Sequence, residues 1–351
     1  MGPTGGSTGK AVPSLAGGSG GKVSPSLKIV GLGGGHGLAA SLAALRTVTD
    51  DLTAIVTVAD DGGSSGRLRR EFGVLPPGDL RMALAALCRD DEWGTTWSRV
   101  VQHRFSGSVP GELDGHALGN LLIVALWELL DDTVAGLDWV GRLLGTGGRV
   151  LPMAAVPLDI VAEVTGADPD FPDRVTVVRG QKECATTPGE VRSISLLPAD
   201  PPAVPEAVQA VHDADWVVFG PGSWFTSVLP HLMVPTLAAA LRSTAARRMV
   251  VLNLAPQPGE TDGFSPHKHL EVLADHAPDL TVDVVLADTN AVGAGTLTDL
   301  EKAAGALGAR LVTADVAMTD GTPRHDPRLL AGEYARCFHD TGFFRNGIKG
   351  E

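Results

Sequence analysis

The sequence predicts an α/β protein with a three-layer, doubly wound and mostly parallel Rossmann-like sheet. Short apolar runs of strand length alternate with Ala- and Leu-rich stretches of helical length along most of the 351 residues. Several of the apolar runs end directly in glycine-rich polar clusters, as parallel strands do where they turn into helices. With 44% hydrophobic residues the chain can bury a large core, and we expect one domain over residues 27–340.

The first element is a strand over 27–30 that enters a glycine turn and then a helix over 38–48. The second strand, 51–59, is β-branched and continuously apolar, as strands buried on both faces are. Asp79 is placed to cap the next helix. The remaining predicted elements are helices at 79–90, 93–105, 116–130, 265–276 and 325–340, and strands at 215–219, 248–254, 282–287 and 310–313.

Three segments depart from this regular alternation. Residues 150–200 carry short β-prone runs broken by Pro, Gly and Asp, which predicts a small β-rich excursion on the main sheet rather than a separate domain. Residues 1–26 are rich in Gly, Ser and Pro and predict a disordered tail or an expression remnant. Residues 341–351 are assigned to a C-terminal tail.

The charge and cysteine content narrow the possible partners and compartment. A formal net charge of -13 argues against a nucleic-acid or anionic-membrane partner, since both need a basic face. Three widely spaced cysteines without a CxxC pair favour free thiols in a reducing compartment. No apolar run reaches a membrane span of about 18 residues, and the N-terminus has no signal-peptide core. We therefore expect a cytoplasmic protein.

Three polar glycine clusters follow predicted strands, at the edge of a parallel sheet where ligands bind. Glycine amides at a helix N-terminus bind anions, which favours phosphate or nucleotide contact over a plain tight turn. The spacing disfavours NAD in the Rossmann manner, because a histidine stands where the fingerprint has its third glycine. The candidate residues of this first cluster are Gly33, Gly34, Gly35, His36 and Gly37.

The second cluster, 60–67, adds acidic and hydroxyl groups. Asp60 and Asp61 could hold Mg²⁺ through water, and Arg67 offers a fork for phosphate. The alternatives are a solvated acidic loop and a hydrolase nucleophile elbow, and the second is disfavoured because two carboxylates destabilise a developing alkoxide. The other candidate residues here are Gly62, Gly63, Ser64 and Ser65.

Further candidates lie on predicted helix starts and on the third glycine turn. The competing interpretations are a capped helix start or a satisfied core histidine for the first five residues, and a tight turn for the next five. Lys268 could reach a phosphate, whereas zinc binding by His267 and His269 is disfavoured because they diverge on a helix. These candidates are Gly78, Asp79, Arg81, His116 and Asn120, followed by Gly220, Pro221, Gly222, Ser223 and Thr226.

Taken in order, six motifs closely resemble the YvcK family, the gluconeogenesis factors related to the CofD phospholactate transferases. The resemblance covers about residues 27–340. The motifs are GGGHGL (33–38), VADDGGSSGRLR (58–69), PPGDLR (76–81), HALGNLL (116–122), GPGSWFTSVLP (220–230) and RHD (324–326).

The resemblance implies a Rossmann-like fold that binds UDP-N-acetylglucosamine or UDP-glucose, with roles in cell shape, peptidoglycan and envelope synthesis, and carbon-source adaptation. It implies that the glycine turns, Asp60–Ser65, Asp79, Arg81 and Asn120 line the ligand cleft. Arg324 would match an arginine on which nucleotide-sugar binding depends in the family. Many relatives carry Thr where His36 stands, so the contact there is expected to be backbone-only or pH-sensitive.

Two functions remain open from the sequence. The favoured one is a nucleotide-sugar-binding regulator that passes a signal to a cell-envelope or signalling protein, needs no cofactor and can form a homodimer. The motifs are rich in phosphate-holding groups without an obvious general base beside a nucleophile. The alternative is a CofD-like transferase in which Asp60 and Asp61 hold Mg²⁺ against a diphosphate.

Overall fold

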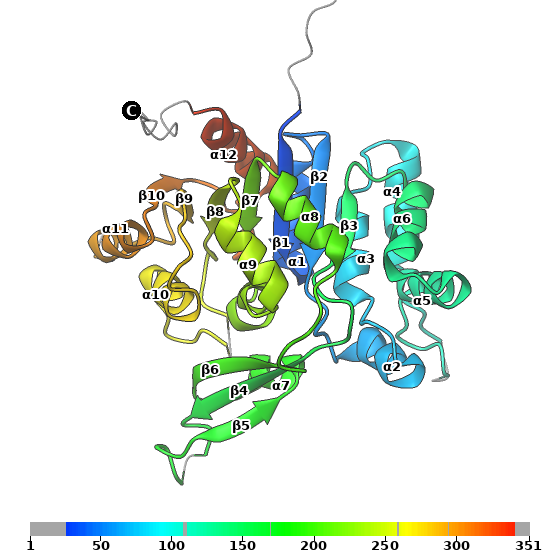
Figure 1. The fold of residues 1–351 in the computed structure, drawn as a ribbon, viewed down its shortest axis with the longest axis horizontal. Helices are drawn as coiled ribbons and strands as arrows, with labels where there is room; N and C mark the ends of the chain where they lie inside the picture. Colours follow the sequence, from blue (N-terminus) through cyan, green and yellow to red (C-terminus); the bar gives the residue numbers. More distant parts are fainter. Residues whose placement is uncertain (1–25, 108–110, 169, 258–259, 294, 341–351) are drawn as a thin grey trace, which may run out of the picture.

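The computed structural model describes residues 26–107, 111–168, 170–257, 260–293 and 295–340. Its centre is a seven-stranded parallel sheet in the order β10-β9-β8-β7-β1-β2-β3 (Figure 1). The strands are β1 Lys28–Gly33, β2 Asp51–Val56, β3 Arg149–Pro152, β7 Trp216–Phe219, β8 Arg247–Val251, β9 Val284–Asp288 and β10 Arg310–Ala314. The predicted doubly wound α/β class is confirmed.

The strand order reverses between β1 and β7. From β1 the chain adds β2 and then β3 on one side, whereas β7 pairs with the other side of β1 and leads outward to β10. Ile29 of β1 lies opposite both Leu52 and Trp216 in register. Because all these strands are parallel, the loops that follow them emerge at one edge of the sheet.

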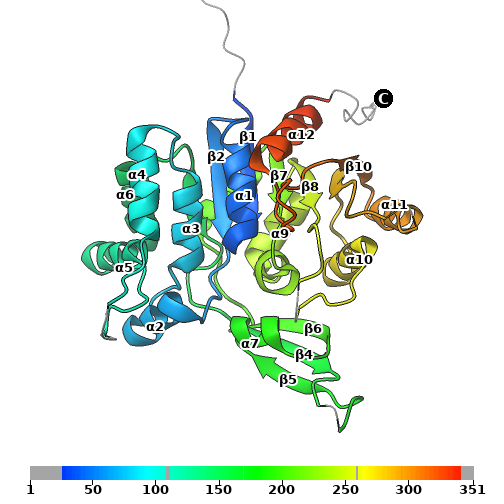
Figure 2. The ribbon, with the colours of Figure 1, turned by 180° about the vertical axis from the view of Figure 1, so that it is seen from behind.

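Helices cover both faces of the sheet. The helices α1 (Gly35–Leu45), α3 (Gly78–Ala86) and α12 (Pro327–His339) lie on one face (Figure 2), and α8 (Pro205–Asp213) and α9 (Pro235–Ser243) lie on the other (Figure 1). Outer helices flank the sheet at both ends. They are α4 (Glu92–Gln102), α5 (Leu118–Leu130) and α6 (Thr133–Leu144) beside β3, and α10 (Pro266–His276) and α11 (Leu297–Ala306) beside β10.

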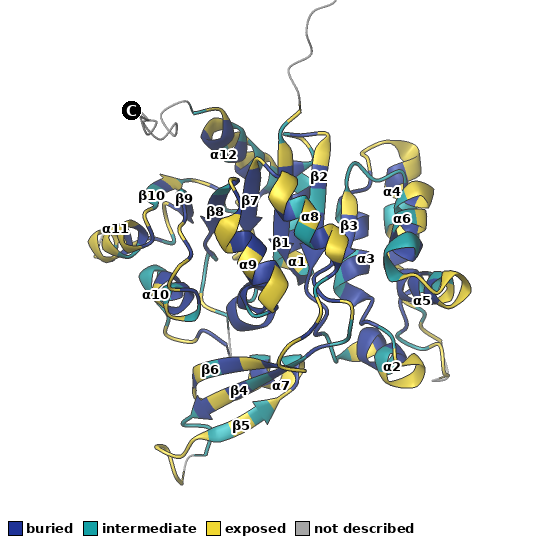
Figure 3. Ribbon diagram, in the orientation of Figure 1, coloured by how far each residue is buried: buried dark blue, intermediate teal, exposed yellow. Residues whose placement is uncertain are grey.

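The central strands are apolar on both faces because helices cover both. All residues of β7 and β9 are buried, and the core continues through the inner faces of α1 and α3 (Figure 3). Among the described residues no single helix is long and apolar enough to cross a membrane. One bent pair of helical segments, Trp224–Leu232 and Pro235–Ser243, reaches that length and apolar content only when both segments are counted together, and they meet at 76°.

The excursion at 150–200 is more independent than the sequence predicts. Only β3 joins the main sheet, whereas β4 (Asp159–Thr165), β5 (Thr176–Arg179) and β6 (Glu190–Leu197) form a separate antiparallel sheet with α7 (Gln181–Thr186) beside it. This small sheet lies beyond the edge at which the parallel strands end (Figure 1).

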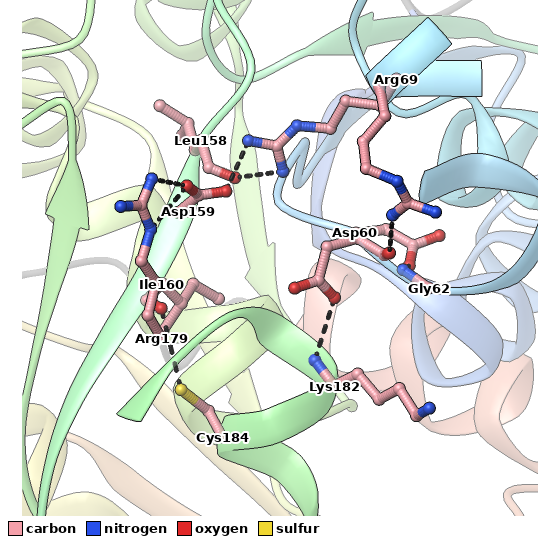
Figure 4. Close-up of polar contacts among 11 residues, drawn as sticks. Asp60, Gly62, Arg69, Leu158, Asp159, Ile160, Arg179, Lys182 and Cys184 are labelled. Atoms are coloured by element: carbon pink, nitrogen blue, oxygen red, sulfur yellow. Dashed lines mark hydrogen bonds and ion pairs between the residues drawn. The ribbon is translucent and has the colours of Figure 1, made fainter. Parts of the chain in front are cut away.

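Asp159 connects the small sheet to the main domain (Figure 4). Its carboxylate accepts from Arg69 of α2 (Gly63–Phe72) at 2.5 Å and from Arg179 of β5. Arg69 also donates to the carbonyl oxygen of Leu158 at 2.9 Å. Two arginines from different elements therefore hold one largely buried carboxylate at the base of the small sheet.

Several element predictions were wrong in detail. Asp79 does not cap α3, because that helix begins at Gly78 and Asp79 lies within its first turn, where its carboxylate instead accepts from the amide of Gly35. The strand predicted to end at Leu254 ends at Val251, because the next residues turn into a cleft. The second polar cluster is largely helix α2, not a loop. The predicted tails at 1–26 and 341–351 lie almost entirely outside the described residues.

Candidate functional site

A cleft of about 680 Å³ opens where the strand order reverses, beyond the ends of β1 and β7. Its walls are the loops that follow β1, β7, β8 and β10, with Asp79 from α3 and Gln181 from α7 closing it. Four strand ends thus contribute to one cavity, although their residues are spread from 34 to 327 in the chain. The candidate residues that line it are Gly34, Gly35, His36, Gly37, Asp79, Pro221, Gly222, Ser223 and Arg324.

The two glycine turns contact each other at the base of this cleft. A Cβ atom on Gly37 would lie 2.4 Å from the carbonyl oxygen of Pro221 and 2.6 Å from Cα of Gly222. Gly34 precedes α1 and has no side chain to cap it, so the amides of His36 and Gly37 donate no hydrogen bond to an N-cap side chain, whereas the amide of Gly35 donates to Asp79. Gly35 has φ +59°, a left-handed conformation that glycine adopts without strain. The turns therefore leave the N-terminus of α1 facing the cleft.

Asn253 holds the second turn in place. Its side-chain oxygen accepts from the amide of Gly222 at 3.0 Å, and its side-chain nitrogen donates to the carbonyl oxygen of Gly222 at 2.8 Å. Sequence reasoning missed this residue because it was assigned to a strand. It lies two residues after the buried end of β8, so the rule that polar residues after parallel strands line the site would have found it.

A pair of carboxylates lies beside the first turn. Asp79 accepts from the amide of Gly35, and a Cβ on Gly34 would meet its Oδ2 at 2.4 Å. Burial raises the pKa of Asp79 to about 7, with a further contribution from the charge of Asp60. Burial and the charge of Asp61 also raise the pKa of Asp60, whose Oδ1 accepts from the amide of Gly62. Near neutral pH the site can therefore take up or release a proton at Asp79.

Helix α12 brings Arg324 and His325 to the rim of the cleft. Asp326 caps α12 by accepting from the amide of Arg328, and α12 packs on α1 through a 2.7 Å hydrogen bond between Tyr334 and Ser41. The Arg324 side chain is 67% exposed and pairs with Asp320 at 3.1 Å.

His325 is buried in the wall of the same cleft. Burial lowers its pKa to about 4, and its Nε2 atom has no hydrogen-bond partner among the described residues. The ring is therefore neutral at physiological pH. The rim thus combines one exposed cation with one neutral imidazole.

The carboxylate of Glu260 accepts hydrogen bonds from backbone amides just after the third glycine turn, 220–223. Its Oε1 accepts from the amides of Phe225 and Thr226, each at 2.8 Å, at the start of the π-helical turn η1 (Trp224–Val228). Burial raises the pKa of this carboxyl, opposed by hydrogen bonds from Ser223 and Thr226. Thr226 is buried and does not line the cleft, so the predicted ligand contact there is replaced by an internal carboxylate.

Four other candidates, Ser64, Arg81, His116 and Asn120, lie together in a buried polar group that does not line the cleft. Ser64 Oγ lies 3.0 Å from His116 Nδ1 and accepts from Asn120 Nδ2 at 3.0 Å. Ser64, His116, Asn120 and Arg81 are all buried. The prediction that His116 and Asn120 share one helical face is wrong, because α5 begins at Leu118 and His116 precedes it, but both side chains contact Ser64.

Other candidates have structural partners outside the cleft. Ser65 Oγ accepts from the amide of Gly78, where a Cβ would crowd Asp60 and Ser65, so this glycine allows α2 and α3 to approach. Lys268 pairs with Glu271 on the exposed side of α10. Gly33 ends β1, Gly220 follows β7, and Gly62 and Gly63 begin α2.

The two carboxylates predicted to hold Mg²⁺ have different partners. Asp61 accepts from the amide of Lys182 in α7, whereas Asp60 faces Gly78 and Ser65. Within the described ranges no group of three or more His, Cys, Asp or Glu side chains is placed to hold a metal ion. The carboxylate that lines the cleft is Asp79, and Asp60 lies close enough for its charge to raise the pKa of Asp79.

Comparison with known proteins identifies the relationship. The fold defines a doubly wound α/β protein with a cleft at the reversal of its strand order. The model of the CofD family, described as 2-phospho-L-lactate transferase CofD, matches residues 29–321. The chain belongs to this family.

Its relatives include the gluconeogenesis factors. The chain is 55% identical over 316 residues to the "Putative gluconeogenesis factor" of Mycobacterium tuberculosis (strain H37Rv), covering 90% of this chain and 91% of the relative. It is 37% identical over 268 residues to the "Gluconeogenesis factor" of Listeria monocytogenes, covering 76% of this chain and 78% of the relative. The crystal structure of a UPF0052 family member from Bacillus halodurans superposes with a TM-score of 0.76 at 32% identity, covering 88% of this chain and 99% of that one. The predicted family resemblance is confirmed.

Proposed function

We propose that the cleft binds a nucleotide sugar of the UDP-N-acetylglucosamine or UDP-glucose type, and that the protein is a regulator that responds to this ligand. The observation that carries the proposal is the contact between the two glycine turns, which directs the N-terminus of α1 at one cavity. Uncapped helix amides and a nearby guanidinium are the groups that hold a diphosphate. A cavity of about 680 Å³ is of the size that binds small molecules.

The polar groups of the cleft favour binding over catalysis. The two histidines that line it, His36 and His325, make no hydrogen bond to a serine, threonine or cysteine among the described residues that line it. A covalent transferase would need such a nucleophile and base pair. The names of the relatives support a role in gluconeogenic carbon use, and we extend the proposal to cell-envelope synthesis, cell shape and a protein partner.

A CofD-like transferase is the second candidate, favoured by the family match and by the Asp60–Asp79 carboxylate pair. Such a pair beside a diphosphate site is a setting in which Mg²⁺ supplies charge for phosphoryl-type chemistry. In that role Asp60 would hold the metal, and Asp79 or Asp61 would complete the carboxylate set.

Calorimetry with UDP-N-acetylglucosamine separates the two candidates when it is paired with a turnover assay. The regulator binds equally well in EDTA and in millimolar Mg²⁺, and the nucleotide sugar is recovered intact. A strict Mg²⁺ requirement with release of a product contradicts the regulator and supports the transferase. Absence of binding under both conditions overturns the nucleotide-sugar proposal itself.

A further inference from the structure

A cluster of unpaired cations lies outside the cleft, at the corner formed by α2, α3 and the segment that joins α4 to α5. Arg67, Arg81 and Arg104 form no ion pair among the residues that the structure describes, although the chain carries a net charge of -13. Arg67 donates to the carbonyl oxygen of Asp114 at 2.6 Å and Arg104 to that of Gly115 at 3.0 Å. Each guanidinium has five N–H donors, so most of them remain available.

Arg81 is the buried member of this cluster. It is 4% exposed, and its Nε atom is enclosed without a hydrogen-bond partner. Its side chain passes over Gly119, where a Cβ would lie 2.8 Å from Arg81 Cγ. Burial is the main cause that lowers the pKa of Arg81 to about 10, and the positive charge of Arg104 lowers it further. The charges of Asp79 and Asp60 raise it. The buried Nε–H group of Arg81 lacks an acceptor, which a bound anion would supply.

Ser64 fixes the orientation of the fourth member, His116. Its Oγ accepts from the amide of Ala117 at 3.3 Å and from Asn120 Nδ2 at 3.0 Å, which occupies both lone pairs. The hydroxyl hydrogen therefore goes to His116 Nδ1, 3.0 Å away, and the ring carries its proton on Nε2. Burial and the charges of Arg67 and Arg104 lower the pKa of His116, opposed by Glu71. Both lone pairs of Ser64 are used, so it acts as a positioning residue rather than a nucleophile.

We propose that Arg67, Arg81, Arg104 and the Nε2–H group of His116 form a binding site for a phosphate-type oxyanion, separate from the glycine-turn cleft. The three arginines come from three elements, and Arg104 is the charge that both Arg81 and His116 experience. Such a convergence of like charges is costly without an anion, because each cation raises the cost of ionising the others. The oxyanion is either a second molecule or the distal phosphate of a larger ligand held in the cleft.

Calorimetric titration with inorganic phosphate tests the site. We expect binding that Arg81→Gln abolishes and that Arg104→Gln weakens by about tenfold, as the loss of one charge-assisted contact does. Arg104 is exposed, so its replacement keeps the test valid if Arg81→Gln fails to fold. The matched control is Arg99→Gln, which removes an exposed arginine from the last turn of α4 and should leave binding unchanged.

Several results would overturn the proposal: no phosphate binding by the wild type, equal effects of Arg99→Gln and Arg104→Gln, or phosphate binding that only Arg324→Ala removes. The last result would assign the phosphate to the cleft, so this test is independent of the proposed function. Titration of phosphate into protein saturated with UDP-N-acetylglucosamine shows whether the oxyanion at this site is a second molecule or part of the ligand in the cleft. Retained phosphate binding indicates a second molecule, whereas competition that depends on Arg81 indicates the distal end of one ligand.

Discussion

The backbones of Gly37 and Pro221 are in contact, although 183 residues lie between them in the chain. Gly37 follows the end of β1, and Pro221 follows the end of β7. The absent Cβ of Gly37 would lie 2.4 Å from the Pro221 carbonyl oxygen. The two glycine turns therefore pack directly on each other, and together they form the base of the cleft.

Replacement of Gly37 by alanine tests that contact. Alanine is better than glycine inside a helix by about 1 kcal/mol, yet we expect Gly37→Ala to destabilise the protein by about 1–3 kcal/mol, because its Cβ meets rigid backbone. Gly332→Ala in α12 is the control, because no atom lies within 4 Å of its new Cβ, and it should stabilise slightly. Urea denaturation measures both. Equal effects of the two substitutions would show that the turns have room to separate.

The raised pKa of Asp79 predicts a particular pH dependence. A carboxyl whose folded pKa is about 7, above its usual 3.8, holds its proton more tightly in the folded state. The free energy of unfolding therefore falls as pH rises from about 4 to about 7, by at most about 1.4 kcal/mol for each pH unit. We expect Asp79→Asn to flatten this part of the stability–pH curve.

The same titration affects ligand binding. Ionised Asp79 repels a diphosphate at the N-terminus of α1, so affinity for UDP-N-acetylglucosamine should fall above pH 7 in the wild type and stay constant in Asp79→Asn. Calorimetry in buffers of different ionisation enthalpy should detect proton uptake on binding only in the wild type. Identical pH profiles for both proteins would remove Asp79 from the site.

Arg324→Ala should abolish nucleotide-sugar binding while the melting temperature of the ligand-free protein stays nearly unchanged. The side chain is 67% exposed, and its ion pair with Asp320 is a surface pair, which contributes little to stability. Arg328→Ala is the matched control, since that side chain is 91% exposed and the cap of α12 uses its backbone amide instead. A large drop in melting temperature for Arg324→Ala would make this arginine structural.

Glu260 should stabilise the second turn. Glu260→Ala leaves two buried amides without an acceptor, which costs about 1–3 kcal/mol, and should also weaken ligand binding by loosening residues 223–226. Glu260→Gln keeps a side-chain oxygen for these amides and should be milder. Chemical denaturation ranks the variants, and an alanine variant as stable as the wild type would show that water replaces the carboxylate.

The sequence was sufficient for the fold class and for the two turns at the cleft. Parallel strands end at one edge of a sheet, so glycine clusters after β1 and β7 had to lie near each other. It was insufficient where long-range packing decides the outcome. Ser64 and His116 meet because α2 and α5 pack side by side, and Gln181 reaches the cleft because the small sheet returns to it.

Some residues that the local sequence pattern assigned to a ligand have partners within the folded protein instead. Thr226 was predicted to contact the ligand, but in the folded chain its amide donates to the carboxylate of Glu260, which lies in the loop after β8. Asp60 and Asp61 are adjacent in sequence, yet they belong to different surroundings because α2 begins directly after them. Adjacency along the chain is a weak guide to a shared site.

A crystal structure of the protein with UDP-N-acetylglucosamine would show whether the two glycine turns hold the diphosphate. We expect the diphosphate on the first amides of α1, between the turns at 34–37 and 221–223, with Arg324 at its rim. A nucleotide sugar bound elsewhere, with both turns free of it, would show that the turns do not form the site.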